Sequence, residues 1–263
     1  MQALHTAATG MAAQELSVQV IANNIANLQT TGYKKQTAAF QDLIYEHIRR
    51  VGAQSSDQGN ILPVGIAIGG GVKTVGTPRS MTQGTLSQTG NDLDLAITGE
   101  GFFKIQMPDG TFQYTRDGTF QMDNQGRVVN AQGNLVQPAI TVPQNSSGLT
   151  VNSQGQVSVT LAGSTATSTI IGQIGLTRFI NKAGLLPVGN NLFQDTPSSG
   201  QPQDGLANAE GYGSITQGSL EQSNVDVVSE MSNMIAAQRA YEMNAKVISA
   251  ADQMLQTTSA LFR

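Results

Sequence analysis

Apolar residues recur every seven positions near the N-terminus, which is the period of helices that pack along a seam. One row consists of Leu4, Met11, Val18 and Ile25. The companion row, offset by three, consists of Ala7, Gln14, Ile21 and Leu28, and Gln14 is its one polar member. The pattern predicts a helix from about Gln2 to Leu28. Gly32 then follows two threonines, and glycine is a natural helix terminator.

The C-terminal stretch repeats the pattern more strongly. Its main row consists of Val227, Met234, Tyr241, Ile248, Leu255 and Phe262, and the row is widened by Ala240, Val247, Met254 and Leu261. Asn224 or Asp226 can cap the start of this segment. We therefore predict a second long helix that reaches Ala260 and contains no glycine or proline.

The N-terminal segment is also rich in small side chains, namely Ala7, Ala8, Ala12, Ala13, Ala22 and Ala26. Small residues let helices pack closely on more than one face, as in a bundle built from many chains. Amphipathic helices more commonly form the core of their own domain, so a closed intramolecular bundle is the alternative. The strict spacing at both ends of the chain favours assembly between chains.

Between the ends the period changes to two. Short alternating segments are separated by Asp-Gly and Gln-Gly turns, which predicts an antiparallel meander. Its strands are expected at 102–107, 111–116, 119–122 and 127–129, with further strands at 149–152, 156–161 and 170–179. The stretch from Gly184 to Gly213 is rich in Gly, Pro, Ser and Asn and is expected to be mostly loop.

Two octapeptides echo each other: Thr82–Thr89 reads TQGTLSQT and Thr216–Ser223 reads TQGSLEQS. One copy enters the predicted β region and the other leaves it. We expect the two copies to lie near each other. The alternative is that a common turn-strand phrase is simply used twice.

These patterns predict an α+β fold. Long N- and C-terminal helices would form a coiled-coil-like core, and a mainly antiparallel β domain would be inserted between them. The expected divisions are a discontinuous helical domain (1–45 and 222–263), an outer β domain (72–221) and a connecting arm (46–71). The stretch from Ile48 to Gly71 follows neither period and is too long for a tight connection. It is either a disordered linker or an extended arm ordered by neighbours.

The composition of the chain argues against several classes of partner and site. The net charge is −4 and charged residues make up 12% of the chain, so a nucleic-acid partner is not expected. Cysteine is absent, which excludes disulfides and thiolate metal sites. No apolar run approaches the ~20 residues of a membrane-spanning helix, so membrane insertion is not expected. The first residues carry no basic start followed by an apolar run, so any export is expected to use a route other than a secretory signal peptide.

Catalytic patterns are nearly missing. The two histidines, His5 and His47, belong to no zinc or nucleophile motif. The glycines before Lys73 lack the spacing of a phosphate-binding loop, and the acidic start at Asp123 lacks the ligands of a calcium loop. Asp92 and Asp94 are expected to be solvated edge charges rather than an acid–base pair. The chain is therefore predicted to be no enzyme and to bind no cofactor or metal.

Four motif blocks resemble bacterial flagellar rod and hook proteins. The helix end ANNIAN (22–27) with TGYK (31–34) is similar to their N-terminal signature. GEGFF (99–103) and YTRDGTF (114–120) resemble their β-domain motifs, and SNVDV (223–227) with MIAAQRAYE (234–242) resembles their C-terminal signature. Together these blocks cover nearly the whole chain in the family's order.

Within this basal-body rod family, the length of the chain and the segment 46–65 resemble distal-rod members, including Gly52–Ser56 and Leu62-Pro63. The resemblance implies a subunit of a helical homopolymer that forms a rigid hollow drive shaft around an export channel. It also implies a place in the rod that spans the periplasm towards the outer membrane. The implied partners are proximal-rod and hook axial proteins, the outer basal-body rings and the flagellar type III export apparatus.

Asparagine is a poor residue for a helix interior, so the amides of the ANNIAN block need a reason. They are expected to bridge helices of neighbouring subunits; the alternative is an ordinary frayed helix end. The predicted subunit interface consists of Leu4, Met11, Val18, Ile21, Asn23, Asn24, Ile25, Asn27, Leu28, Val227, Met234, Gln238, Tyr241, Ile248, Leu255 and Phe262. The arm is expected to contribute Arg49, Arg50, Gln54 and Leu62.

Other functions stay open on the sequence. One is another rod subunit or a short hook protein. A second is a soluble adhesin-like module with a dimeric coiled coil, and a third is a periplasmic hydrolase of the cell wall.

Overall fold

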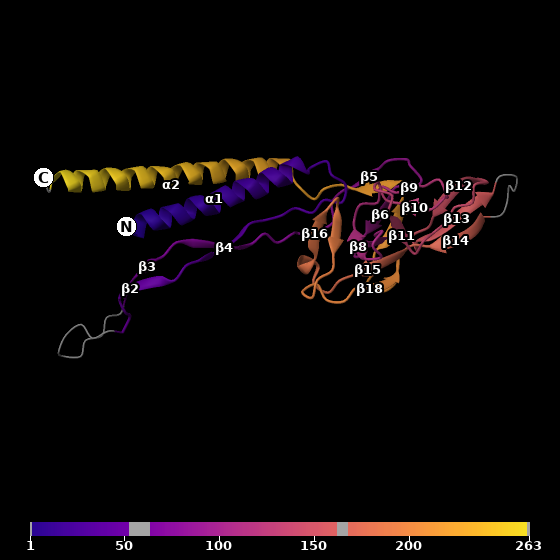
Figure 1. Cartoon of the computed structure of the whole chain (residues 1–263), viewed down its shortest axis with the longest axis horizontal. Coiled ribbons are helices and arrows are strands. Elements are labelled where there is room, and N and C mark those ends of the chain that lie inside the picture. The colour runs from indigo at the N-terminus through magenta and orange to yellow at the C-terminus, as the bar shows by residue number, and fades with distance from the viewer. Residues whose placement is uncertain (1, 53–63, 162–167, 262–263) are drawn as a thin grey trace. The chain divides into compact units, whose positions relative to one another are not determined.

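The computed structural model describes residues 2–52, 64–161 and 168–261. It confirms an α+β fold with a helix at each end of the chain and antiparallel strands between them (Figure 1). The chain divides into two compact units. The helical unit comprises residues 1–25, 36–78 and 226–263, and the β unit comprises residues 26–35 and 79–225.

Both helices begin and end near their predicted bounds. Helix α1 spans Gln2–Ala26 and helix α2 spans Val227–Leu261. Gly32 follows α1 with φ +66°, a conformation that glycine adopts without strain. Asp226 caps α2, because its carboxylate accepts the Val228 N–H at 3.2 Å and the Ser229 hydroxyl at 2.7 Å. Asn224, the other cap considered, uses its side chain inside the β unit.

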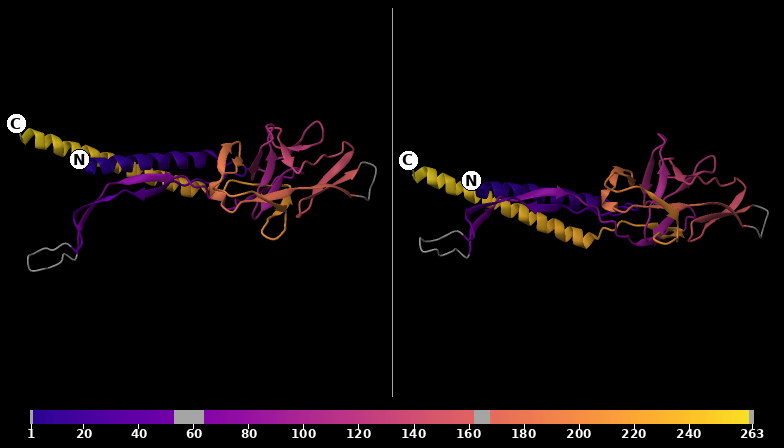
Figure 2. Two further views of the ribbon diagram at one scale, coloured as in Figure 1. Left: turned by 60° about the horizontal axis from the view of Figure 1, so that its bottom comes forward. Right: turned by 90° about the horizontal axis from the view of Figure 1, so that it is seen from below.

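The arm is a ribbon of paired strands. Strand β1 (Ala39–Asp42) pairs with β4 (Val72–Gly76), and β2 (Tyr45–Arg49) pairs with β3 (Ile66–Gly69), both antiparallel. The two sides of the ribbon run together in both views of Figure 2 (purple). The described part of the arm thus consists of paired strands rather than a structureless linker, and its ordering by neighbouring subunits stays a prediction. Gln54 and Leu62 lie outside the described residues.

The β unit contains a seven-stranded antiparallel sheet with the order β16-β17-β8-β7-β11-β10-β9. Its strands are β7 (Phe103–Gln106), β8 (Phe112–Thr115), β9 (Gln121–Met122), β10 (Val128–Val129), β11 (Leu135–Gln137), β16 (Leu186–Gly189) and β17 (Leu192–Gln194). The predicted antiparallel meander is confirmed only for the neighbours β7-β8 and β9-β10, because β8 and β9 do not pair and β11 lies between β7 and β10.

Smaller sheets complete the β unit. A three-stranded sheet consists of β12 (Ser146–Val151), β13 (Gln156–Leu161) and β14 (Ser168–Gln173). The pairs are β15 (Gly175–Arg178) with β18 (Gln203–Leu206) and β19 (Ser214–Gln217) with β6 (Leu95–Thr98). A short 3₁₀ turn covers Lys182–Gly184.

The structure corrects one strand prediction and adds three short strands to a predicted loop region. The single strand expected at 170–179 is broken at Ile174, whose N–H donates to the Gly155 carbonyl at 2.7 Å, so β14 and β15 belong to different sheets. The stretch Gly184–Gly213 lies mostly outside strands, as predicted, but it also holds the short strands β16, β17 and β18. These strands are short and contain Pro187 and glycines, which hid them from a propensity argument.

The echoed octapeptides do meet. Strand β5 (Leu86–Gln88) pairs antiparallel with β20 (Ser219–Glu221), and Ser87 lies opposite Leu220. The Thr89 N–H donates to the Gly218 carbonyl and the Gln222 N–H donates to the Thr85 carbonyl, both at 2.8 Å. The two copies therefore pair with each other where the chain enters and leaves the β unit.

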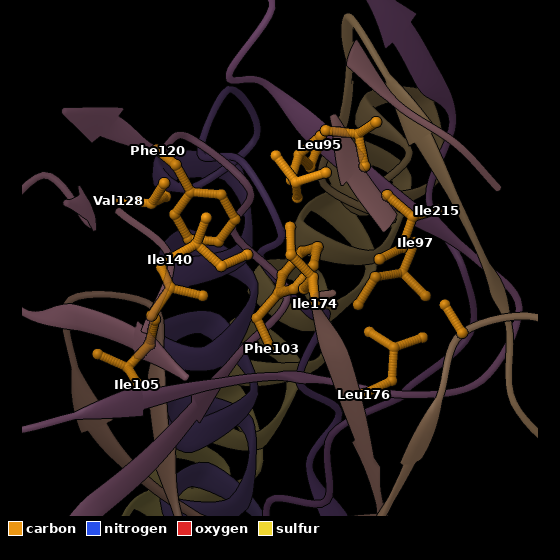
Figure 3. Close-up of a cluster of buried hydrophobic side chains, with 14 of the residues drawn as sticks. Leu95, Ile97, Phe103, Ile105, Phe120, Val128, Ile140, Ile174, Leu176 and Ile215 are labelled. Atoms are coloured by element: carbon orange, nitrogen blue, oxygen red, sulfur yellow. The ribbon is translucent and has the colours of Figure 1, made fainter. Parts of the chain in front are cut away.

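The main core gathers apolar side chains from several of these sheets (Figure 3). Phe103 and Phe120 meet edge to face at its centre, with ring centroids 5.0 Å apart. A second cluster contains Phe102, Tyr114, Phe179, Leu185 and Phe193.

The expectation that Asp92 and Asp94 are solvated is wrong for Asp94. Asp94 is buried rather than solvated, and its carboxylate accepts the Thr89 hydroxyl at 2.6 Å and the Asn91 amide at 3.0 Å.

Candidate assembly interface

Within the helical unit, α1 and α2 contact each other in antiparallel directions. The Asn24 amide donates to Glu230 at 3.0 Å, and a Cβ on Gly10 would lie 2.9 Å from the Asn244 amide nitrogen. Residue 24 thus lies against residue 230 and residue 10 against residue 244. Residue numbers therefore rise along α1 where they fall along α2, as in an antiparallel pair. Three α2 residues are fully buried: Glu230, Ala237 and Ala251. Together with Asn244 they recur every seven positions, so the seam inside one chain consists of small and polar side chains.

The apolar row of α2 lies beside this seam and is largely uncovered. Val227 is 37% exposed, Tyr241 44% and Leu255 48%, whereas Met234 and Ile248 are half-buried. Further exposed apolar side chains on the same helix are Val228, Met231, Ile235, Met243, Val247 and Met254. Burying one such side chain is worth about 1.5–3 kcal/mol. The helix therefore presents a long apolar surface that its own chain leaves in water.

The matching row of α1 is better covered. Leu4, Met11, Val18 and Ile25 are half-buried, as are Ile21 and Leu28. The buried positions of α1 include Ala7, Ala13 and Val20. The row thus keeps part of its surface available while its small neighbours are covered.

The three asparagines of the ANNIAN block have different surroundings. Asn24 is 1% exposed, and its amide donates to the Gln36 carbonyl at 2.8 Å as well as to Glu230, while its oxygen accepts the Gln36 N–H at 2.9 Å. These hydrogen bonds of the Asn24 side chain are therefore made within its own chain. Asn23 is exposed, and Asn27 accepts the Thr30 hydroxyl at 3.2 Å. Gln238 is exposed on α2, and Phe262 lies outside the described residues.

The ribbon of the arm exposes several large apolar side chains. Ile44 is 91% exposed, and Tyr45, Ile48, Ile66 and Ile68 are also uncovered. Arg49 at the end of β2 and the following Arg50 are exposed as well. At its base the ribbon touches α1, since the Val72 N–H donates to the Thr9 hydroxyl at 3.4 Å. An exposed two-stranded ribbon is marginally stable by itself, so this surface too is suited to a partner.

Three charged side chains form a buried cluster in the β unit, here named the ionic node: Lys34, Arg116 and Glu221. One Glu221 oxygen accepts Lys34 Nζ at 2.6 Å and the other accepts Arg116 Nη1 at 3.2 Å. The Gly84 N–H also donates to Glu221, at 2.9 Å. Lys34 and Arg116 donate onward to the Thr82 and Gly99 carbonyls, at 2.8 and 2.7 Å.

The node is almost closed to water. Lys34 and Glu221 are each 1% exposed and Arg116 is 3% exposed. Burial lowers the pKa of the Lys34 ammonium below its ordinary value, because the charged form loses its hydration, and Glu221 offsets only part of that effect. The formal count is two cations and one carboxylate. Removing the carboxylate would therefore leave two buried cations facing each other.

The node joins segments that are distant in sequence. Lys34 ends the TGYK signature, Arg116 lies in the YTRDGTF motif and Glu221 belongs to the second echoed octapeptide. Spacing along the chain gave no sign that these three charges meet. The only sequence signal was the echo, which predicted that the octapeptide containing Glu221 lies near residues 82–89.

Known sequences match this chain along its length. Residues 4–34 match the family described as "Flagella basal body rod protein", residues 96–159 match "Flagellar hook protein FlgE/F/G D1 domain", and residues 216–261 match "Flagellar basal body rod FlgEFG protein C-terminal". The flagellar basal-body rod protein FlgG of Caulobacter vibrioides is 52% identical over 99% of both chains. The chain belongs to the flagellar basal-body rod protein family.

Other rod proteins agree. FlgG of Borreliella burgdorferi is 45% identical over all of this chain and 99% of its own, and FlgG of Buchnera aphidicola from Acyrthosiphon pisum is 45% identical over 96% of both. The three residues of the ionic node come from the three regions matched by the families, with Lys34 in the first, Arg116 in the second and Glu221 in the third. The node is thus a point where the separately matched regions of a rod protein contact each other.

No group of three or more His, Asp or Glu side chains in residues 2–52, 64–161 and 168–261 is arranged to hold a metal ion. Over the same residues, neither helix is both long and apolar enough to cross a membrane.

Proposed function

We propose that this chain is a structural subunit of the flagellar distal rod, which polymerises into a rigid hollow shaft that carries motor torque to the hook. The observation that carries the proposal is the uncovered apolar row of α2. Helix α2 buries Ala237 and Ala251 but leaves Tyr241 and Leu255 exposed, so the described part of its own chain does not cover its apolar row. The full-length match to rod proteins supports further copies of the chain as that partner.

The proposed packing is coiled-coil-like and uses two seams. The seam within the chain, at Asn24–Glu230 and Gly10–Asn244, is small and polar. The seam between chains would use the apolar heptad rows, from Leu4 to Leu28 on α1 and from Val227 to Leu255 on α2, with Asn23, Asn27 and Gln238 at its border. Because one chain would then bind two different surfaces of its neighbours, the contact is heterologous and generates an open helical polymer.

The arm would stiffen the polymer. Its exposed aliphatic side chains, with Arg49 and Arg50 beside them, would pack between neighbouring subunits. Many such repeated contacts would resist bending, as a drive shaft requires. The divisions expected from the sequence fit this role, with the helices as the inner wall around the export channel and the β unit outside.

The wider partners follow from the same role. A distal-rod subunit would join proximal-rod and hook axial proteins, run through the outer basal-body rings and leave the cell by the flagellar type III export apparatus. The role is structural and involves no catalysis.

The test compares two aspartates placed two residues apart on α2. Leu255→Asp charges the apolar row, whereas Gln253→Asp adds the same charge at an exposed polar position. Losing one buried leucine costs about 1.5–3 kcal/mol, so Leu255→Asp should raise the critical concentration for polymerisation by roughly tenfold to a hundredfold. Gln253→Asp should change it by less than about threefold. Equal critical concentrations, measured by sedimentation of polymer, would refute the proposed seam.

A further inference from the structure

The segments at which the chain enters and leaves the β unit are tied to one another. The side-chain oxygen of Asn224 accepts the Lys35 N–H at 2.7 Å, and its amide donates to the Ser80 and Thr82 carbonyls at 2.9 and 3.1 Å. The Ser80 N–H donates to the Lys35 carbonyl at 2.9 Å. Lys35 leads into the arm, Ser80 returns from it and Asn224 leads to α2, so one amide holds all three connections.

Two residues of the ionic node are close in sequence to the residues of this amide contact. Lys34 directly precedes Lys35, and Glu221 lies three residues before Asn224. The Gly32 N–H donates to the Glu221 carbonyl at 2.8 Å, and the Thr31 hydroxyl donates to Asp117 at 2.9 Å. The segment that follows α1 is therefore fixed to the strand that precedes α2.

We propose that the ionic node and Asn224 form an assembly clasp, which holds the connections to α1, the arm and α2 together in the monomer, before any copy has docked. The proposal rests on the proposed function and assigns Lys34, Glu221 and Asn224 a positioning role in polymerisation.

The physical reason is effective concentration. Segments tethered close to one another by short connections meet at millimolar effective concentration. Asn224 is followed by α2 at Val227, and Gly32 follows the end of α1 at Ala26, so both connections are short. If the clasp holds, docking on a neighbour orders α1, arm and α2 as one cooperative step. Without it, each element would be ordered separately.

The clasp can be opened while the β unit stays folded. Lys34→Met removes one cation and leaves Arg116 and Glu221 as a neutral pair, so no unpaired charge remains buried. Asn224→Asp keeps the shape of the side chain and its acceptor for Lys35, but turns the donor towards Ser80 and Thr82 into a carboxylate oxygen facing two carbonyls. The matched controls are Lys104→Met, in a partly exposed ion pair, and Asn124→Asp, on an exposed turn.

A backbone substitution at Gly32 should also open the clasp. Gly32 has φ +66°, and a Cβ there would lie 2.8 Å from the Arg116 backbone carbon, so Gly32→Ala should push the segment away from the node. Gly110→Ala is the control, because φ is +84° there and nothing lies within 4 Å of the added carbon. Both variants carry the strain of a positive φ, and only Gly32→Ala adds the clash.

Distance measurement in the monomer gives the direct reading. The chain has no cysteine, so Gln29→Cys and Gln222→Cys, both at exposed positions, carry two spin labels without background. The parent should give one narrow distance distribution in dilute solution, and so should the controls. Lys34→Met, Asn224→Asp and Gly32→Ala should broaden it, with amide exchange of the β-unit core unchanged. A broad distribution in the parent would overturn the clasp.

Polymerisation gives the functional reading. The three clasp variants should polymerise roughly tenfold more slowly at equal concentration, and their controls should match the parent. Broadened distances with unchanged polymerisation rates would overturn the positioning role. If the parent itself does not polymerise, the proposed function fails, whereas the distance distribution still tests the clasp.

Discussion

At the scale of single residues, the ionic node shows how burial sets the cost of a charge change. Glu221 balances two buried cations, so Glu221→Gln should lower the free energy of unfolding of the β unit by about 3–5 kcal/mol. Glu100→Gln should cost less than about 1 kcal/mol, because Glu100 pairs with Lys182 at a half-exposed position. Urea unfolding of both variants measures the difference. Equal losses would mean that the node is not the closed cluster described here.

A second residue-scale prediction concerns alkaline pH. Burial raises the pKa of Tyr114 to about 12, with Asp195 and Asp204 adding to the effect. Because the folded-state pKa lies above the ordinary value of 10.0, the folded state keeps the phenol protonated when the unfolded chain loses that proton. The stabilisation is complete below pH 10 and is lost as the pH rises towards 12.

The Tyr114→Phe variant cannot ionise at this position. Its free energy of unfolding should therefore fall less steeply than that of the parent between pH 10 and 12, by on the order of 2 kcal/mol in total. Urea unfolding at several alkaline pH values measures both curves. Parallel curves would contradict the assigned burial of the phenol.

At the scale of elements, the contact between the arm and α1 depends on Gly71. A Cβ at this position would lie 2.3 Å from the Thr9 hydroxyl oxygen, and φ is +115°. Gly71→Ala should therefore loosen the base of the ribbon and give a polymer with a shorter persistence length in electron micrographs. Gly76→Ala, where nothing lies within 4 Å, should leave the polymer as stiff as the parent. Equal stiffness of the two variants would separate the arm from rigidity.

The elements also show what a sequence can predict. Heptads at Leu4–Ile25 and Val227–Leu255 predicted both helices, and Asp-Gly turns predicted the meander, because these signals are local. Strands β2 and β3 were not predicted, because Ile66 and Ile68 are exposed and no buried face of the ribbon imposes an alternation of apolar and polar residues. The ionic node was not predicted either, because its three charged residues are distant in sequence and come together through the long-range pairing of β5 with β20.

The same limit applies to the helix seam. The sequence places apolar rows on both helices, but it does not say which row a chain covers by itself. The contact between α1 and α2 within one chain uses Gly10, which allows close approach to Asn244, and the Asn24 amide, which donates a hydrogen bond to Glu230. The apolar rows beside them are left over and become the candidate interface.

At the scale of the whole molecule, we expect the terminal helices to stay incompletely packed until copies of the chain meet. A long amphipathic helix cannot bury its apolar row alone, and most helical stability in proteins comes from such packing. The dilute monomer should therefore keep a folded β unit with helices that open readily. Polymerisation should then protect both helices together.

Hydrogen–deuterium exchange of the dilute monomer and of the polymer tests this most directly. We expect amides of residues 2–26 and 227–261 to exchange within seconds in the monomer and to be protected at least a hundredfold in the polymer, while strands around Phe103 and Ile215 stay protected in both. Full protection of both helices in the dilute monomer would contradict the account, because the chain would then complete its helices without a neighbour.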